Sequence, residues 1–262
     1  MNIKKKLIKL DWILRAQLGI DIKKLITAFF RIPAYIVDLI RFKRVYKGEL
    51  KLVPSLHDRF SSNGDYEHEY FWQDLFVAQN IFNANPTIHL DIGSRIDGFV
   101  SNLATCRKVT VIDIREQSIK IPNVSFEQAD LMDSSSISIY ANHFESISCL
   151  HTIEHFGLGR YGDSIMIDGF DIGFVNIVSM LKKGGVLYLS TPVSSRSYVE
   201  FNSNRVTNFK KIIASSEDLD LTIKDFRTIT EYGVSKSLIE NPQDAMKDVG
   251  DYILGLFIIE KN

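Results

Sequence analysis

The chain has 262 residues, and 45% of them are hydrophobic, so it can bury a full core and suits one domain with an extension. Its net charge of −1 argues against a nucleic acid as the main partner. The two cysteines, Cys106 and Cys149, fall on separate predicted elements without metal-ligand spacing, which indicates buried thiols in a reducing compartment.

The first 47 residues form a basic segment. They hold twelve Lys or Arg against three Asp, a net charge of +9, so the remainder of the chain carries −10. Apolar residues at helical spacing predict a helix over 3–18, a second that stops near Pro33, and a third over 34–46. We expect a basic helical arm over 1–47, followed by a domain over 48–262.

Three interpretations of the arm stay open: contact with an anionic membrane face, contact with another subunit, or packing as a cap with a solvated basic side. The basic start lacks the clean apolar core and cleavage site of a signal peptide. Arg31, Pro33 and Asp38 interrupt the most apolar stretch. We therefore expect no membrane span and a cytoplasmic protein, with the arm touching at most the inner membrane face.

The next predicted helix begins near residue 66 and ends before Pro86. It carries Phe71, Leu75, Ala78 and Phe82 on one face.

The stretch HLDIGSRIDGFV, residues 89–100, predicts a strand, a glycine-containing turn and a helix. Gly93 lets a ligand approach the backbone, and the helix beyond offers unpaired N–H groups. The spacing of Gly93 and Gly98 matches neither a phosphate-binding loop nor a dinucleotide fingerprint. Asp91 suits a cationic ligand better than a pyrophosphate, although an ordinary strand-to-helix turn also explains the pattern.

A second strand follows in KVTVIDIR and ends at Asp113, twenty-two residues after Asp91. A carboxylate at the tip of this strand can accept hydrogen bonds from both hydroxyls of a ribose. A nucleoside without phosphates that carries a positive group fits S-adenosylmethionine. The run VSFEQAD then predicts a short third strand that ends at Asp130, and a serine-rich loop covers 134–138.

The fourth strand, in FESISCL, leads into His151, Glu154 and His155. This HxxEH spacing would form a zinc site on a helix, but a strand precedes it and GLGRYGD follows at once. A histidine of near-neutral pKa can instead take a proton from a hydroxyl group. Histidines that only shape the loop are the alternative.

An amphipathic helix over about 170–181, capped by Gly184 and Gly185, leads to a fifth strand that Pro192 stops. Residues 194–206 are predicted to form a polar loop over the open end of the sheet. LTIKDFRTIT and YILGLFIIEK predict the sixth and seventh strands.

The phrases YFWQDLFVAQNIF, HLDIGSRIDGFV, VTVIDIR, LHTIEHFGLGRYGD, LKKGGVLYLSTPV and FNSNRV occur in this order within residues 66–206, and GLFIIEK follows near the C-terminus. Together they resemble class I S-adenosylmethionine-dependent methyltransferases. More narrowly, they resemble a bacterial domain-of-unknown-function family, number 268, whose members tend to belong to surface-polysaccharide gene sets. The resemblance implies a doubly wound, Rossmann-like α/β fold of about seven strands behind the helical arm.

The resemblance also implies roles for particular residues. The expected cofactor site, for S-adenosylmethionine, comprises Asp91, Gly93, Ser94, Arg95, Gly98, Asp113, Ile114, Asp130, Leu131 and His151. Asp130 would contact the adenine amino group, and Tyr70 and Asp74 on the preceding helix can face the ligand. The expected catalytic residues are His155, Glu154 and Asp163, and the expected substrate contacts are Arg160, Tyr161, Asn202 and Arg205. Arg95 stands where such enzymes usually have glycine.

Three functions are weighed. The first is methyl transfer to an oxygen of a saccharide or surface-polymer precursor, with no metal. The second is a non-catalytic methyltransferase-like module that binds a partner or polymer. The third and most distant is a metal-dependent hydrolase that uses His151, Glu154 and His155.

Overall fold

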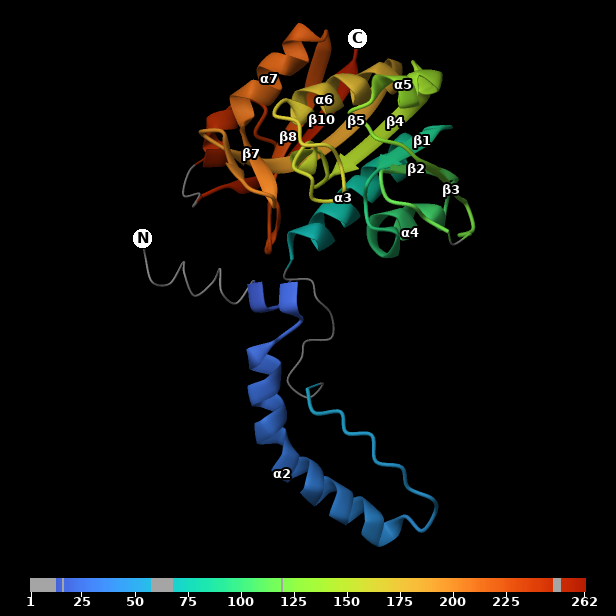
Figure 1. Ribbon diagram of the computed structural model, residues 1–262, viewed down its shortest axis with the longest axis vertical. Coiled ribbons are helices and arrows are strands. Elements are labelled where there is room, and N and C mark those ends of the chain that lie inside the picture. Colours follow the sequence, from blue (N-terminus) through green and yellow to red (C-terminus); the bar gives the residue numbers. More distant parts are fainter. Residues whose placement is uncertain (1–12, 16, 58–67, 119, 247–250) are drawn as a thin grey trace. The chain divides into compact units, whose positions relative to one another are not determined.

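The computed structural model describes residues 13–15, 17–57, 68–118, 120–246 and 251–262. The chain forms two units, Met1–Asp65 and Tyr66–Asn262 (Figure 1). The arm boundary expected at residue 47 stays a prediction.

The first unit contains the long helix α2, Ile22–Val45. Asp21 caps its start, because its carboxylate accepts the Lys24 backbone N–H at 3.0 Å. The predicted break at Pro33 is wrong: α2 continues through this residue. Proline removes only one helical hydrogen bond, and the many turns on either side hold the helix together. Most of the predicted helix over 3–18 lies outside the described residues, although 13–15 and 17–18 are helical.

The second unit is built on one sheet, with the strand order β3-β2-β1-β4-β5-β10-β8-β9. The strands β1 to β5 run parallel, and β10 lies antiparallel between β5 and β8. This arrangement confirms the doubly wound, Rossmann-like α/β fold, in a sheet of ten strands where about seven were expected. The bounds in sheet order are Val124–Gln128, Val109–Asp113, His89–Ile92, Phe144–Leu150, Leu181–Ser194, Ile253–Lys261, Leu221–Thr230 and Gly233–Val234.

Helices cover both faces of this sheet (Figure 1). One core contains Phe170 and Ile177 of α6, Gly169–Met180, together with Ile212 of α7, Phe209–Asp218. The other contains Val77 of α3, Glu69–Ala84, and Leu103 of α4, Ser101–Ala104. A single π-helical turn, Ile96–Val100, precedes α4, and a 3₁₀ helix covers Pro242–Met246.

The helix α3 forms where it was predicted, but the predicted set does not form its buried face. Its fully buried residues are Gln73, Val77 and Ile81, whereas Phe71, Leu75 and Phe82 are exposed. The inward row begins with Glu69 and Gln73, which find polar partners at the end of the sheet. These polar contacts explain why α3 turns Gln73, Val77 and Ile81 towards the sheet, an orientation that the spacing of hydrophobic residues alone does not predict.

Three predicted connections differ from the structure. The loop over 194–206 contains a hairpin, with β6 at Tyr198–Glu200 and β7 at Asn204–Asn208. Pro192 does not stop β5, because β4 pairs with β5 only as far as Ser190 and so leaves that side of the strand free at residue 192. The serine-rich segment forms the short helix α5, Ser134–Ile137, and a 3₁₀ turn over Ser138–Tyr140.

Only one of the two cysteines is buried as the sequence predicts. Cys149 is buried in β4 as expected, but Cys106 is exposed, because it follows the last turn of α4. Within the part of the chain that the structure describes, no helix combines the length and apolar character needed to cross a membrane.

Candidate functional site

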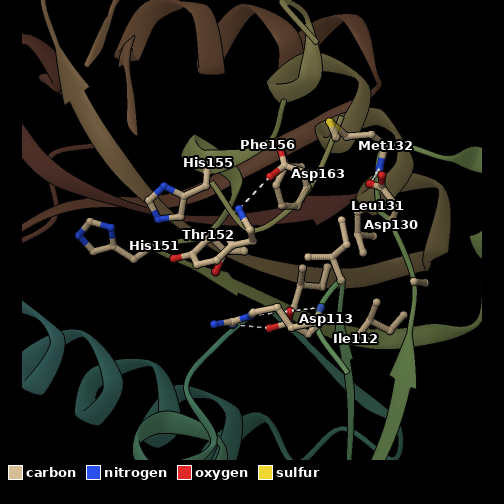
Figure 2. A pocket seen from close by; sticks show the side chains of 16 residues that line it. Ile112, Asp113, Asp130, Leu131, Met132, His151, Thr152, His155, Phe156 and Asp163 are labelled. Atoms are coloured by element: carbon tan, nitrogen blue, oxygen red, sulfur yellow. Dashed lines mark hydrogen bonds and ion pairs between the residues drawn. The ribbon is translucent and has the colours of Figure 1, made fainter. Parts of the chain in front are cut away.

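A cavity that opens to solvent lies at the carboxyl ends of the parallel strands (Figure 2). It lies beside β1, where the chain order reverses between β2 and β4, the usual ligand position in open α/β sheets. In Figure 2, His151 and His155 lie at one end and Asp130 at the other. The lining residues are Ile92, Gly93, Ile112, Asp113, Ile114, Arg115, Ala129, Asp130, Leu131, Met132, His151, Thr152, His155, Phe156, Tyr161 and Asp163.

Gly93 supplies the tight turn after β1. Its φ is +68°, and a Cβ there would lie 2.5 Å from Thr152 Cγ2, so only glycine fits. Asp91 does not line the cavity. It is fully buried, where it accepts the Ser94 hydroxyl at 2.8 Å and the Ser148 hydroxyl at 2.6 Å. Burial raises the pKa of Asp91 to about 7. These two residues therefore fix the shape of the turn.

Arg95 and Gly98, two other residues expected in the cofactor site, do not line the cavity either. Arg95 is exposed and pairs with Asp97 at 2.7 Å. At Gly98, a Cβ would lie 3.4 Å from Asp74 Oδ2 on α3. Burial raises the pKa of Asp74, so the chain holds a second carboxyl group of raised pKa near this turn.

Asp113 and Ile114 lie in the cavity wall at the tip of β2. The Asp113 carboxylate accepts three bonds from Arg115: from Nη2 at 2.6 Å, from Nε at 2.9 Å and from the backbone N–H at 2.8 Å. A carboxylate offers about four acceptor positions, so about one remains for a ligand. The Arg115 guanidinium also lies 4.6 Å from the centre of the Tyr161 ring.

The other end of the cavity is largely apolar. Leu131, Met132 and Phe156 line it, and Asp130 is its acid. One Asp130 oxygen accepts the Met132 backbone N–H at 2.8 Å. This end therefore suits a flat apolar ring that carries a hydrogen-bond donor.

His151 lies between two carboxylates. Its Nδ1 bonds to Glu154, and its Nε2 lies 3.1 Å from Glu69 Oε1 on α3. Burial alone would lower the pKa of His151, but the two glutamates raise it to about 10. His151 is therefore an imidazolium at neutral pH. Tyr70 stacks on its ring at 4.7 Å.

Glu154, expected at the mouth of the cavity, is fully buried and absent from the cavity wall. It holds His151 in place, and its second oxygen has no hydrogen-bond partner within the described residues. Ser190 also links His151 to helix α3. Its hydroxyl accepts the His151 backbone N–H at 3.0 Å and donates to the Gln73 side chain.

His155 lies four residues further along, as the last residue of the 3₁₀ turn Ile153–His155. Its Nδ1 lies 2.8 Å from the Ser203 carbonyl oxygen. Arg160 Nη1, which only donates, lies 3.2 Å from Nδ1 and 3.4 Å from Nε2. The carbonyl only accepts and is the shorter contact, which favours the proton on Nδ1 and the lone pair on Nε2 in the neutral ring. Burial, aided by the positive charge of Arg160, lowers the pKa of His155 despite Glu154 nearby. His155 is therefore a neutral base in the cavity wall.

The loop that follows contributes two lining residues, Tyr161 and Asp163. Asp163 holds the loop in shape by accepting the backbone N–H groups of Gly159 and Tyr161, each at 3.1 Å. Arg160 lies outside the wall, and its Nη1 donates to the Ser203 carbonyl at 2.8 Å.

Neither Asn202 nor Arg205 lines the cavity. Arg205 Nη2 donates to the carbonyls of Met166 at 2.7 Å and Phe156 at 3.1 Å, so it braces the segment over the cavity. Asn202 is exposed in the hairpin turn. The substrate roles expected for both stay predictions.

Sequence reasoning missed Glu69 and Arg115. Glu69 was an exposed acid in the pattern, and its partner lies 82 residues away. Arg115 had a local signal, since it follows Asp113 by two residues. The HxxEH residues lie on a strand end and a 3₁₀ turn, and no cluster of three metal-ligand candidates occurs in the described ranges.

Solved structures with a similar fold include the 1,6-didemethyltoxoflavin-N1-methyltransferase of Burkholderia thailandensis with S-adenosylhomocysteine, at 14% identity and TM-score 0.49, over 72% of this chain and 79% of that one. The N-methyltransferase NodS of Bradyrhizobium japonicum matches at 16% identity and TM-score 0.45, over 74% and 87%. The [4+2]-cyclase SpnF matches at 14% and 0.48, over 67% and 75%. These likenesses support no inference about activity. No curated protein matches.

A family model described as "Caenorhabditis protein of unknown function, DUF268" matches residues 103–237, more than half of the chain. The description names Caenorhabditis where bacteria were expected, and it contains no link to surface polysaccharides. The match spans the tip of β2, the HxxEH turn and the hairpin. The chain therefore belongs to the DUF268 family.

Proposed function

We propose that this chain is an S-adenosylmethionine-dependent methyltransferase that acts on a hydroxyl group, with saccharides as the first acceptor class to test. One observation carries the proposal: a single cavity collects the Gly93 turn, the Asp113 carboxylate and the neutral base His155. These groups come from the ends of β1, β2 and β4, which are neighbours in the sheet and meet at one edge of it.

The lining of the cavity suits S-adenosylmethionine in its charge and in its division into a polar and an apolar end. The three acids Asp113, Asp130 and Asp163 outnumber the two cations of the wall, Arg115 and His151, which suits a cationic ligand. Asp113 would hold the ribose, the apolar end with Asp130 would hold the adenine, and the Gly93 turn would face the methionine part. Arg115 competes for Asp113, so a ribose with two hydroxyls must displace one of its bonds.

When bound, S-adenosylmethionine supplies an activated methyl group. His155 takes the proton from the acceptor hydroxyl at Nε2 and keeps its own proton on Nδ1, bonded to Ser203. The resulting imidazolium is stabilised by the nearby Glu154 carboxylate, which acts on His155 through its charge.

Titration calorimetry with S-adenosylmethionine and S-adenosylhomocysteine tests the cofactor. We expect Asp113→Ala to weaken binding about 10- to 100-fold, because the ribose loses a charged acceptor. The exposed Asp218→Ala, on α7, is the matched control and should bind as the wild type does. Equal affinity in a folded Asp113→Ala protein would contradict the role of Asp113. Transfer of a tritiated methyl group to a panel of methyl glycosides then tests the acceptor.

The Asp113–Arg115 pair also supports a second candidate, a module of this fold that binds a partner without a cofactor. In that case Arg115 permanently satisfies Asp113, and neither cofactor nor product binds the wild type. Arg115→Gln separates the two. Under the proposed function it binds S-adenosylmethionine at least as tightly as the wild type, because Asp113 is freed. If only the variant binds, the second candidate holds.

A further inference from the structure

The helix α2 exposes a large apolar surface. It has 24 residues, and none of them is buried. Among its side chains, Leu25 is 62% exposed, Phe29 70% and Phe30 73%. Together with the other large apolar residues of the helix, these side chains form an exposed apolar surface of the kind that binds a protein or a membrane. The inference concerns this helix alone and does not depend on the proposed function.

Up to Arg41, the apolar stripe and the charged residues lie on different sides of α2, and Lys43 and Arg44 then follow in line with the end of the stripe. Residues 25, 29, 32, 36 and 40 recur every three or four positions, and residues 26, 30 and 37 continue the same stripe. The opposite side carries Lys23, Lys24, Arg31 and Arg41. Because Pro33 does not break α2, the stripe runs along one helix instead of two short ones. The stripe runs from residue 25 to residue 40, which is most of the helix.

The charge of the helix selects the partner. It carries six basic residues and one acid, Asp38, which is paired with Arg31 at 2.9 Å. Lys43 and Arg44 form a basic last turn, and Lys47 follows. An apolar stripe flanked by cations fits the boundary between the headgroups and acyl chains of an anionic membrane. We propose that α2 lies in the surface of an anionic membrane and attaches the chain to it peripherally.

A second copy of α2 fits less well. Pairing two apolar stripes side by side would bring two basic helices together, and only Asp38 on each could offset the repulsion. An anionic lipid surface instead attracts every basic side chain, by a factor of about five in partitioning for each. The charge therefore favours lipid over self-association.

Sedimentation of the full chain with vesicles tests the proposal. We expect binding to vesicles of phosphatidylglycerol and phosphatidylcholine at low salt, weak binding to pure phosphatidylcholine, and release as salt rises. Phe29→Glu should reduce partitioning at least tenfold. Ala34→Glu adds the same charge to the opposite side of the same helix and should cost much less. Lys43→Gln with Arg44→Gln should reduce partitioning about 25-fold, whereas exposed Lys183→Gln with Lys210→Gln should not.

Circular dichroism and gel filtration of each variant exclude loss of folding as the cause. The proposal is overturned if the full chain stays in the supernatant with anionic vesicles. It is also overturned if Phe29→Glu and Ala34→Glu partition alike, because the apolar stripe then has no role. A concentration-dependent oligomer that Phe29→Glu dissolves, without vesicle binding, would assign the stripe to a second copy. The Lys43→Gln with Arg44→Gln variant and its control keep the test informative should Phe29→Glu fail to fold, because an unchanged partitioning of that variant would also overturn the proposal.

Discussion

The two histidines of the turn after β4 lie four residues apart, yet one is a cation and the other is neutral. His151 is enclosed by Glu154 and Glu69, which raise its pKa to about 10. At His155, burial and the charge of Arg160 lower the pKa. Both rings line the same cavity. The neighbouring carboxylates, more than burial, therefore decide which ring is a cation and which is a base.

The two histidines therefore have different roles in the proposed reaction. A base must be neutral at the working pH, and His155 is. A fixed imidazolium holds helix α3 to the sheet, and His151 does this through Glu69. Substitutions of His155, or of the charged residues beside either histidine, test these two roles separately.

The largest effect is expected from His155→Ala. Removing the base should lower turnover about 100- to 10,000-fold while cofactor affinity stays nearly intact. The assay is methyl transfer to an acceptor found in the glycoside panel, beside calorimetry with S-adenosylhomocysteine. The exposed His143→Ala serves as the matched control. Unchanged turnover would remove the base from the mechanism, and lost cofactor binding would move His155 into the cofactor site.

Glu154→Gln should destabilise the protein by about 3 kcal/mol, because it removes one partner of a buried ion pair. The His151 imidazolium then keeps only Glu69. Urea unfolding at pH 7 measures this loss, with the exposed Glu217→Gln as the control. A loss below about 1 kcal/mol would mean that the buried pair contributes little.

Glu69→Gln should cost less, about 1 kcal/mol at pH 7, because Glu69 is 31% exposed and solvent screens the pair. The sign of its pH dependence follows from the raised pKa of His151. Stability from the pair is fully present below 6.5, the ordinary value, and is lost as pH rises through about 10. Melting temperatures of wild type and variant should therefore converge between pH 7 and pH 10. A constant difference would show that His151 is not the titrating partner.

Arg160→Gln should have the smallest effect, a shift of the acid limb of the pH profile of turnover. With a lowered pKa, His155 keeps its base form until pH falls below 6.5, so the wild-type limb lies in that range. Removing the guanidinium should move the limb to higher pH. Arg205→Gln disturbs the loop without facing His155 and controls for loop damage. A limb shifted equally by both variants would point to loop damage.

The sequence predicted most of the sheet, because its strands are marked by β-branched runs and by acids at their tips, as at Asp113. It also located the Gly93 turn, since a positive φ demands glycine. It could not predict which face of α3 packs against the sheet. Phe71 and Phe82 suggested one inward face, but Glu69 and Gln73 find partners far away in the chain, and these contacts put Val77 and Ile81 inside. The Asp113–Arg115 pair was missed for a different reason, since nearby residues pair only if their rotamers allow it.

The position of β10 has a consequence for synthesis. This strand pairs with β5 on one side and with β8 on the other, so residues 253–261 complete the middle of the sheet. While the ribosome is still making residues before Ile253, β8 and β9 have no connection through strands to the rest of the sheet. The cavity wall from β1 to β4 can form earlier, because its strands pair only with one another on that side. The nascent chain therefore assembles its candidate site before it closes the sheet that supports it.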